Sequence, residues 1–401
     1  MGFTVRTLTS DDFDAFQRLV TASFLADPRP GEIARWRAVF APERHHGVFE
    51  GDEMIGGAGV LPRRMTLPEA RPVPVAAVTS VGVKPGHHRR GVGTALMRGQ
   101  LHDLHEHHEP VAALWASEAG IYDRFGYGSA AEVARFEIPR GAAFRRGVDT
   151  GSDRPREVPR DEAMPLVTEV YERVRTTRTG WLDRSAGDWE VAFGDDEADR
   201  HGASALRWVV LPDGYAVYRV KGDWTDRGPR HWLEVVELTA ADDVTFAALY
   251  RYLLDLDLVG EITFRTASDD PAPHLLTDPR AVRRQRGDSL WVRLVDVDRA
   301  LPLRHYASDA DAVLQVRDPL CPWNEGRWRF TARGGEAVAR RADGDADLVL
   351  DVQALGAAFL GGTRLTTMAR AQRVREVTPG VLETLSRAFV GDHDPHCPEV
   401  F

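Results

Sequence analysis

The first part of the chain alternates between helix-like and strand-like patterns of apolar residues. Phe13 and Phe16 recur near the helical period after a polar Ser10, which predicts a helix with Ser10 as its N-cap. A second helix is predicted where Met97 and Leu101 share one face. Strands are predicted at 3–7, 47–50, 54–61, 75–83 and 111–115. Strands that alternate with helices in this way predict an α/β domain.

A polar stretch rich in proline and glycine, at 147–161, has the composition of a linker. Beyond it, Pro212-Asp213-Gly214 separates two alternating runs and predicts a hairpin. The other elements predicted here are a helix at 162–174, strands at 206–211, 215–220, 232–238 and 261–266, and a helix through Phe246 and Leu253. The order of these elements repeats the strand–helix–strand order of the first segment.

A third segment begins near Arg283 and carries several alternating strands followed by helices. Strands are predicted at 290–297, 312–316, 327–332 and 345–352, and helices at 352–359 and 379–389. The 401 residues are enough for two to four domains. We therefore predict a mixed α/β (α+β) protein with three domains, at 1–148, 155–285 and 286–401.

Charge and cysteine content narrow the class of protein. The formal net charge is −10, which argues against a general nucleic-acid binder and favours small cationic partners. The two cysteines, Cys321 and Cys397, are too few for a disulfide framework and fit a reducing compartment. No apolar run approaches the roughly 18 residues of a membrane span, and the first residues lack a signal-peptide pattern. We expect a cytoplasmic protein with no membrane partner.

The strongest chemical signal is a glycine- and arginine-rich loop between the strand at 75–83 and the next helix. It reads His-Arg-Arg-Gly-Val-Gly at 88–93. Glycines let successive backbone N–H groups converge on an anion, and the helix N-terminus adds its dipole, so the loop suits a pyrophosphate. The spacing fits neither a Walker loop nor a dinucleotide fingerprint. The alternative is an arginine-rich helix cap on a surface loop.

A second motif, Ala-Ser-Glu-Ala-Gly-Ile-Tyr-Asp-Arg-Phe-Gly-Tyr-Gly at 116–128, follows the buried strand at 111–115. Together with Arg-Arg-Gly-Val-Gly, it resembles the GNAT superfamily of acetyl-CoA-dependent N-acetyltransferases and, within it, the Eis branch. Further agreement lies in the segments at 212–220, 273–280 and 290–294, and in the final phenylalanine. The resemblance therefore covers all three segments.

The resemblance implies a catalytic GNAT domain, a degenerate GNAT-like domain and a C-terminal domain like sterol carrier protein. It also implies a homo-hexamer that acetylates amines of aminoglycosides at more than one position, with acetyl-CoA as co-substrate. Tyr122 would be the general acid and the α-carboxylate of Phe401 the general base. The residues implied to bind acetyl-CoA are Val81, Gly82, Val83, Arg89, Arg90, Gly91, Val92, Gly93, Thr94, Ser117 and Glu118. Those implied to line the substrate pocket are Phe24, Trp36, Asp288 and Glu399.

Elementary chemistry agrees with these roles. Amide formation from a thioester needs a neutral amine and a proton for the departing thiolate. A tyrosine, with a pKa near 10, is protonated at neutral pH, whereas a free α-carboxylate, with a pKa near 3.5, needs burial or a bridging water to act as a base. The alternatives are a core aromatic for Tyr122 and a frayed terminus for Phe401. His88 departs from the GNAT superfamily pattern, which has Gln or Arg three residues before the first glycine, and we expect it to weaken phosphate binding.

Other features define what is not expected. In the middle segment, Asp242 and Asp243 precede the helix where the first segment has glycines, so we expect one active site per chain. The histidines at 102, 105, 107 and 108 are interpreted as a solvated helix face, and no metal site is expected there or at His393, His396 and Cys397. Two alternative functions remain open: acetylation of protein lysines or polyamines, and a lipid-binding scaffold with a vestigial GNAT domain.

Overall fold

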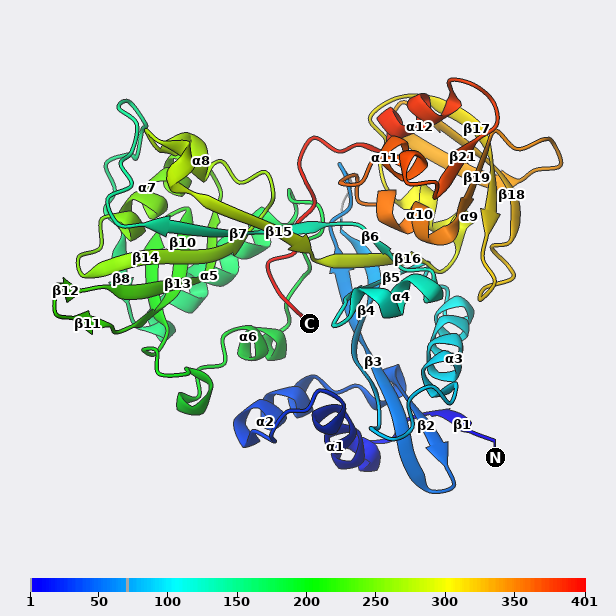
Figure 1. Ribbon diagram of the computed structural model, residues 1–401, viewed down its shortest axis with the longest axis horizontal. Helices are drawn as coiled ribbons and strands as arrows, with labels where there is room; N and C mark the ends of the chain where they lie inside the picture. The colour runs from blue at the N-terminus through cyan, green and yellow to red at the C-terminus, as the bar shows by residue number, and fades with distance from the viewer. Residues whose placement is uncertain (1, 70–71) are drawn as a thin grey trace.

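The structure is a computed structural model that describes residues 2–69 and 72–401 (Figure 1). The first sheet has seven strands within the described residues, in the order β1-β2-β3-β4-β5-β16-β6. Their bounds are β1 (Thr4–Thr7), β2 (His45–Glu50), β3 (Glu53–Met65), β4 (Val73–Val83), β5 (Val111–Trp115), β16 (Leu290–Leu294) and β6 (Gly128–Ser129). The helices of this region are α1 (Phe13–Ser23), α2 (Pro30–Val39), α3 (Val92–Glu106) and α4 (Ala119–Tyr122).

The second sheet also has seven described strands, in the order β15-β7-β14-β13-β10-β9-β8. They are β15 (Arg283–Asp288), β7 (Glu132–Pro139), β14 (Val259–Thr266), β13 (His231–Ala240), β10 (Gly214–Lys221), β9 (Arg207–Leu211) and β8 (Arg156–Val158). Around it lie α5 (Arg160–Arg175), α6 (Ala186–Ala192), α7 (Asp243–Leu254), α8 (Ala272–Leu275) and a small hairpin of β11 (Trp224–Thr225) and β12 (Gly228–Pro229). In both sheets a parallel strand pair is linked by a crossover helix, α3 in the first sheet and α7 in the second.

Two strands lie in a different sheet from their neighbours in the sequence. Strand β7 lies inside the predicted first domain, yet it pairs with β14 and β15 of the second sheet. Strand β16 lies inside the predicted third domain, yet it pairs with β5 and β6 of the first sheet. The predicted boundaries at 148 and 286 therefore do not separate the sheets. Strand β7 precedes the first boundary but belongs to the second sheet, and β16 follows the second boundary but belongs to the first sheet.

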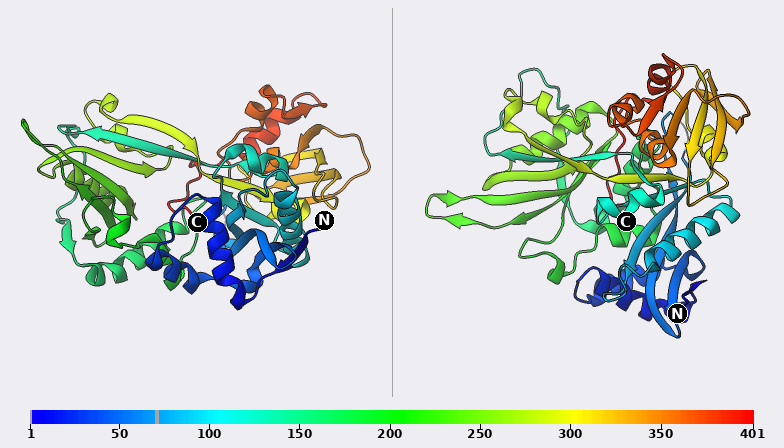
Figure 2. Two further views of the ribbon diagram at one scale, coloured as in Figure 1. Left: turned by 60° about the horizontal axis from the view of Figure 1, so that its bottom comes forward. Right: turned by 45° about the vertical axis from the view of Figure 1, so that its right-hand side comes forward.

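The third region is a smaller sheet covered by helices (Figure 2). Its described strands run β19-β18-β17-β20-β21, with bounds β19 (Glu336–Arg341), β18 (Gly326–Arg333), β17 (Ala310–Arg317), β20 (Leu348–Asp351) and β21 (Val374–Glu376). The helices are α9 (Val297–Ala300), α10 (Val352–Ala358), α11 (Leu365–Arg370) and α12 (Val381–Phe389). Alternate residues of β17 are buried, as expected for a strand with one covered face.

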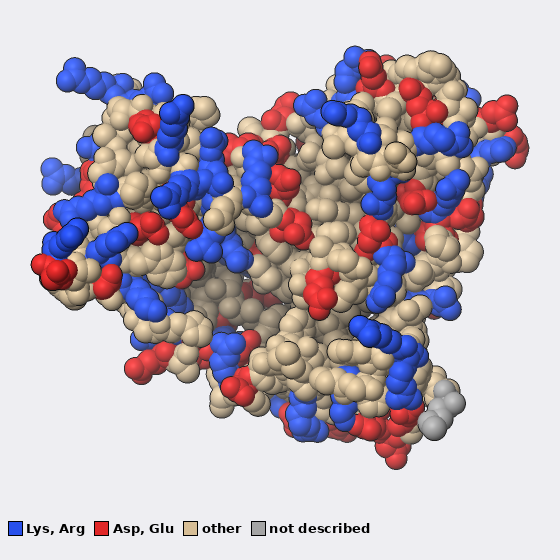
Figure 3. Space-filling model, in the orientation of Figure 1, with Lys and Arg blue, Asp and Glu red and all other residues tan. Residues whose placement is uncertain are grey.

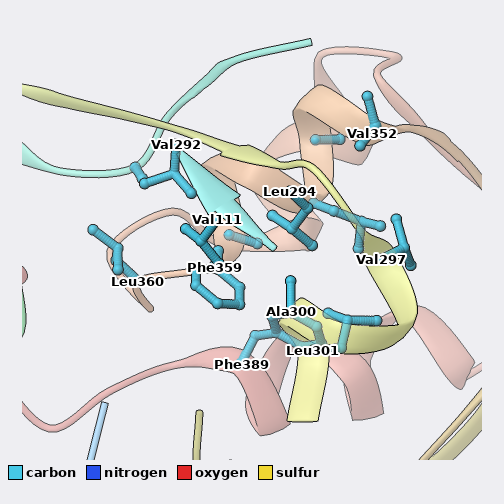
Figure 4. Close-up of a cluster of buried hydrophobic side chains, with 14 of the residues drawn as sticks. Val111, Val292, Leu294, Val297, Ala300, Leu301, Val352, Phe359, Leu360 and Phe389 are labelled. Carbon is cyan, nitrogen blue, oxygen red and sulfur yellow. The ribbon is translucent and has the colours of Figure 1, made fainter. Parts of the chain in front are cut away.

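One hydrophobic core joins the third region to the first sheet. Figure 4 shows Val111 and Val292, from the first sheet, in the same cluster as Phe359 and Phe389 of the third region. Helix α10 packs directly on β16, where a Cβ at Gly356 would lie 2.2 Å from the carbonyl oxygen of Val292. A side chain would not fit between these two backbones, so glycine allows the close approach.

Most strands with strong patterns form as predicted, and the strand at 111–115 matches exactly. Two local predictions are wrong, and one helix was missed. Ser10 is not the cap of α1, because a short 3₁₀ turn (Ser10–Asp12) precedes that helix and Thr9 caps the turn. Helix α2 was not predicted at all. The histidine-rich face of α3 is not wholly solvated, because the His105 ring stacks on Trp323 of the third region with a centroid separation of 4.0 Å.

Candidate active site

Strands β4 and β5 diverge soon after they begin to pair. Their parallel pairing covers Ala76–Ala77 of β4 against Ala112–Ala113 of β5, whereas β4 continues to Val83. A bulge between β3 and β4 accompanies the divergence, and within it Ser80 has a φ of 53°, in the left-handed region. The last residues of β4 therefore turn toward a gap where β5 supplies no ladder partner. Backbone groups there are available to a ligand.

The glycine- and arginine-rich loop lies directly after this diverging strand. Gly91 has a φ of 87° and is the N-cap of α3, a conformation that glycine adopts without strain. Arg90 pairs with Glu50 at 2.6 Å, and Arg89 is exposed. The His88 ring nitrogen Nε2 lies 3.0 Å from the carbonyl oxygen of Val83, so the ring N–H donates to the strand end. The loop thus places the N-terminus of α3 directly after the diverging strand end.

A cavity of about 740 Å³ opens beside the same gap. Figure 3 shows the molecule hollowed where the lobes meet. The structure brings seven of the predicted site residues together in its lining: Phe24, Trp36, Val81, Ser117, Tyr122, Asp288 and Phe401. These residues come from segments far apart in the sequence, including α1, α2, β4, β15 and the chain end. The volume lies within the usual range for small-molecule sites, roughly 300–1,000 Å³.

Tyr122 ends the short helix α4, and its side chain is only 4% exposed. Burial raises the pKa of its phenol above the usual value, the Ser117 side chain acts in the opposite direction, and the charge of Glu118 raises it further. The phenol therefore stays protonated at neutral pH. A protonated hydroxyl at a cavity wall can donate a proton or a hydrogen bond to a reacting group.

The cavity wall carries charges of both signs. Asp27, Glu32 and Asp288 are acidic, and four arginines also line it. Arg29 among these is paired with Asp199 at 2.6 Å and with Glu32 at 3.1 Å. Asp288 accepts a hydrogen bond from the indole Nε1 of Trp291 at 2.7 Å, which fixes its carboxylate at the wall.

Glu399 is the one predicted substrate residue that the structure does not bring into this cavity. It lines an adjacent cavity of about 190 Å³, and its carboxylate accepts from Nε of Arg184 at 2.5 Å. Nη2 of Arg63 lies 3.6 Å from its other oxygen. Neither Arg63 nor Arg184 was predicted as a site residue, because nothing in their local sequence marks them. Trp36, Val400 and Phe401 line both cavities.

Comparison with known proteins identifies the family. The chain is 34% identical to the N-acetyltransferase Eis of Mycobacterium tuberculosis (strain ATCC 25177 / H37Ra), over 98% of each chain. This chain belongs to the Eis family of N-acetyltransferases. An uncharacterized N-acetyltransferase of Streptomyces avermitilis is 39% identical over 100% of both chains. Among solved structures, Eis1 from Mycobacterium abscessus superposes with a TM-score of 0.89 at 35% identity, covering 99% of this chain and 100% of that one.

Family models agree with the Eis assignment region by region. Two models described as acetyltransferase (GNAT) domain match residues 4–130 and 180–294, and one described as sterol carrier protein domain matches 297–398. The predicted fold, tandem GNAT domains followed by a sterol-carrier-protein-like domain, is confirmed, as is the prediction that the protein is an acetyltransferase. GNAT acetyltransferases use acetyl-CoA. Among the described residues, no helix is long and apolar enough to cross a membrane, and no group of metal-binding side chains gathers.

Proposed function

We propose that this Eis-family enzyme transfers an acetyl group from acetyl-CoA to amines of small cationic substrates, aminoglycosides among them, at more than one position. The observation that carries the proposal is that Tyr122 and Phe401 line one cavity, at the gap between the diverging strands β4 and β5. A proton donor and the last residue of the sequence thus meet where a thioester and an amine can both enter.

The residues around the gap fit acetyl-CoA. The diverging end of β4, at Val81, Gly82 and Val83, offers backbone groups to the pantetheine arm, with Ser117 and Glu118 on the opposite side. The pyrophosphate fits the loop at 89–94, where Gly91 supports a left-handed turn into the N-terminus of α3. A Cβ at Gly93 would meet only Val83 Cγ2, at 3.8 Å, and a Cβ at Gly91 would meet nothing within 4 Å, which leaves room for phosphate groups.

The chemistry needs three tasks from this chain. The α-carboxylate of Phe401 accepts a proton from the substrate ammonium, directly or through water, so that a neutral amine can attack. A backbone N–H at the end of β4 stabilises the developing oxyanion. Tyr122 then donates its proton to the departing sulfur, and the second proton that the amine nitrogen loses as the amide forms restores the phenol. The acetyl thioester supplies the activated carbonyl.

The cavity supports a small cationic substrate rather than a long chain of fixed shape. Its volume suits a drug-sized molecule. Glu32 is paired with Arg29, but Asp27 and Asp288 form no ion pair within the described residues and provide partners for ammonium groups. Ammonium groups at different positions on one molecule could each reach the same carboxylate by rotation of the substrate, which supports acetylation at more than one position.

We also propose assembly into a homo-hexamer. Support comes from Trp224, which is 71% exposed on the small hairpin of β11 and β12. An exposed indole at the end of a hairpin is typical of contacts between subunits. Light scattering after size exclusion measures the mass of the assembly and tests this proposal. If Trp224→Ser lowers that mass, the hairpin lies in an interface between subunits.

Thiol release from acetyl-CoA tests the proposed activity. A panel would include aminoglycosides, a polyamine and a lysine-containing peptide, with mass spectrometry of each product. We expect release with aminoglycosides and products carrying more than one acetyl group. Thiol release with the peptide alone would indicate that the substrates are lysine side chains of proteins. No release with any amine, together with tight binding of lipid, would favour the scaffold function.

A further inference from the structure

The second GNAT domain contains a gap equivalent to that of the first. Its parallel strands β13 and β14 pair as far as Val235 and Phe264, whereas β13 continues to Ala240. A cavity of about 380 Å³ lies at these diverging ends. The N-terminus of α7 at this gap is already occupied by its own carboxylate, because Asp242 accepts from the backbone N–H of Thr245 at 2.8 Å. A pyrophosphate would meet this negative charge, so the gap does not suit coenzyme A.

The C-terminal tail lies at this second gap. His393, His396 and Pro398 line the cavity. The backbone N–H of His396 donates to the carbonyl of Thr179 at 2.9 Å, and Ser268 Oγ donates to Asp394 at 2.7 Å. Figures 1 and 2 show the tail leaving α12 and passing between the lobes to the middle of the molecule. The C-terminal tail therefore lines the gap that would hold a cofactor in a catalytic GNAT domain.

Past this cavity, the tail is held by a buried charge network. The Arg184 side chain is 1% exposed and donates to Glu237 from both Nη atoms, at 3.1 and 2.7 Å, while its Nε donates to Glu399. Its guanidinium also lies 4.2 Å from the ring centroid of Tyr171. Arg63, on strand β3 of the first domain, lies beside the Glu399 carboxylate, with Nη2 at 3.6 Å. All three domains meet at Glu399.

The position of Glu399 limits where Phe401 can lie. Two residues separate their Cα atoms by at most roughly 7 Å, since the chain extends about 3.3–3.6 Å per residue. Val400, between them, is 59% exposed, so it contributes little to holding the chain end. Phe401 is partly buried and packs against the core shared by the first and third domains. The ion pair of Glu399 with Arg184 thus anchors the chain two residues before its last residue.

We propose that the second GNAT domain has become the holder of the catalytic tail, with Arg184 as a positioning residue that acts through Glu399 to fix the α-carboxylate of Phe401. This inference rests on the proposed function, because it gives the carboxylate its role as general base. Arg184 contacts neither substrate nor cofactor in this role. Its effect on turnover passes entirely through the last residues of the chain.

The test compares Glu399→Gln, deletion of Phe401, and the two changes combined. Glu399→Gln keeps the shape of the side chain, removes its charge, and leaves Arg184 paired with Glu237. We expect deletion of Phe401 to lower kcat by about 10²–10⁴-fold, the usual range for loss of a general base, and Glu399→Gln to lower kcat at least ~10-fold. The Kd for coenzyme A is expected to stay unchanged in both variants. The combined variant is expected to be no slower than the Phe401 deletion, because groups that act as one unit are not additive.

The pH profile separates positioning from a general loss of structure. Without a placed base, turnover needs a substrate amine that is already neutral. The kcat of Glu399→Gln is therefore expected to rise about tenfold per pH unit up to the amine pKa, whereas the wild type levels off earlier. Glu234→Gln is the matched control, since Glu234 is an exposed acid on the same strand as Glu237, and it is expected to match the wild type in rate and profile.

Each outcome decides a different claim. Wild-type kcat in Glu399→Gln beside an inactive Phe401 deletion would overturn the positioning role and leave the proposed function standing. Losses that multiply in the combined variant would also overturn it, because Glu399 would then act on the substrate itself. Full activity in the Phe401 deletion would show that the Phe401 carboxylate is not the general base, and this inference would fail with it.

Discussion

Tyr122 and Tyr127 lie edge to face, with their ring centroids 6.1 Å apart. Tyr122 lines the large cavity, whereas Tyr127 is fully buried and its hydroxyl has no hydrogen-bond partner among the described residues. Two neighbouring phenols of one motif therefore have different surroundings, and they form a natural pair of test and control.

Tyr122→Phe is expected to lower kcat by about 10²–10⁴-fold and to leave coenzyme A binding unchanged, because it removes a proton donor without changing the ring. Tyr127→Phe is expected to keep kcat within about twofold, since no partner loses a bond. Thiol release at saturating substrate measures both. Equal rates in the two variants would leave Tyr122 as a packing residue.

The pH dependence of turnover follows from the direction of the Tyr122 shift. Burial raises the pKa of this phenol above its usual value near 10, so the proton donor is present at every lower pH. We expect thiol release to rise with pH as the substrate amine loses its proton, and to show no decline below about pH 10. A decline centred near pH 8 in the wild type, absent from Tyr122→Phe, would mean that the phenol ionises much more easily.

Gly91→Asp is expected to weaken coenzyme A binding at least ~10-fold in calorimetry. An aspartate is strained at a φ of 87°, and its charge would repel a pyrophosphate at the N-terminus of α3. Gly141→Asp is the matched control, because Gly141 has the same φ and open space around its Cβ position but lies outside the loop at 88–93. Equal affinities in the two variants would put the cofactor elsewhere.

A tag fused after Phe401 converts its carboxylate into an amide and removes both charge and basicity. We expect such a protein to fold and bind acetyl-CoA but to acetylate amines poorly, whereas the same tag before Gly2 leaves activity intact. Parallel thiol-release assays of the two proteins make the comparison. If both turn over equally fast, the carboxylate is not the base.

Stability depends strongly on a buried pair between the first and third regions. Arg293 of β16 donates to Asp318 at 2.7 Å, and their side chains are 0% and 1% exposed. Asp318→Ala leaves a buried guanidinium without its counter-charge and is expected to cost about 3–5 kcal/mol of unfolding free energy. Asp311→Ala, which breaks the exposed pair with Arg329, is expected to have a much smaller effect, because water screens that pair. Urea unfolding followed by tryptophan fluorescence compares them.

Local sequence patterns predicted where strands lie better than they predicted which strands pair with one another. The apolar run at 290–294 is a strand, as expected, but nothing in it shows that it pairs with β5 of a sheet built mainly from the first 130 residues. Likewise β7 alternates in burial, yet its place in the second sheet depends on β14 and β15, which lie more than a hundred residues away. Pairing of this kind is a property of the whole fold.

The candidate site was predictable where residues belong to one motif. The loop at 88–93 and Tyr122 could be chosen because glycine spacing and an aromatic signature follow adjacent strands. Glu399 could not be placed, because its position depends on Arg184 and Arg63, which share no motif with it. The substrate residues Phe24, Trp36 and Asp288 do line the large cavity, and their contact with substrate stays a prediction.

The exchange of β7 and β16 affects the order in which the protein can fold during synthesis. As the ribosome releases the chain, β5 emerges early, but its neighbour β16 follows only after the whole second domain has been made. Until then β5 has an open edge that can pair with other nascent chains. An isolated fragment ending near residue 130 would keep that open edge permanently, so expression of the catalytic domain alone is expected to yield aggregates. Expression of both GNAT domains in one chain through β16 is expected to cover this edge.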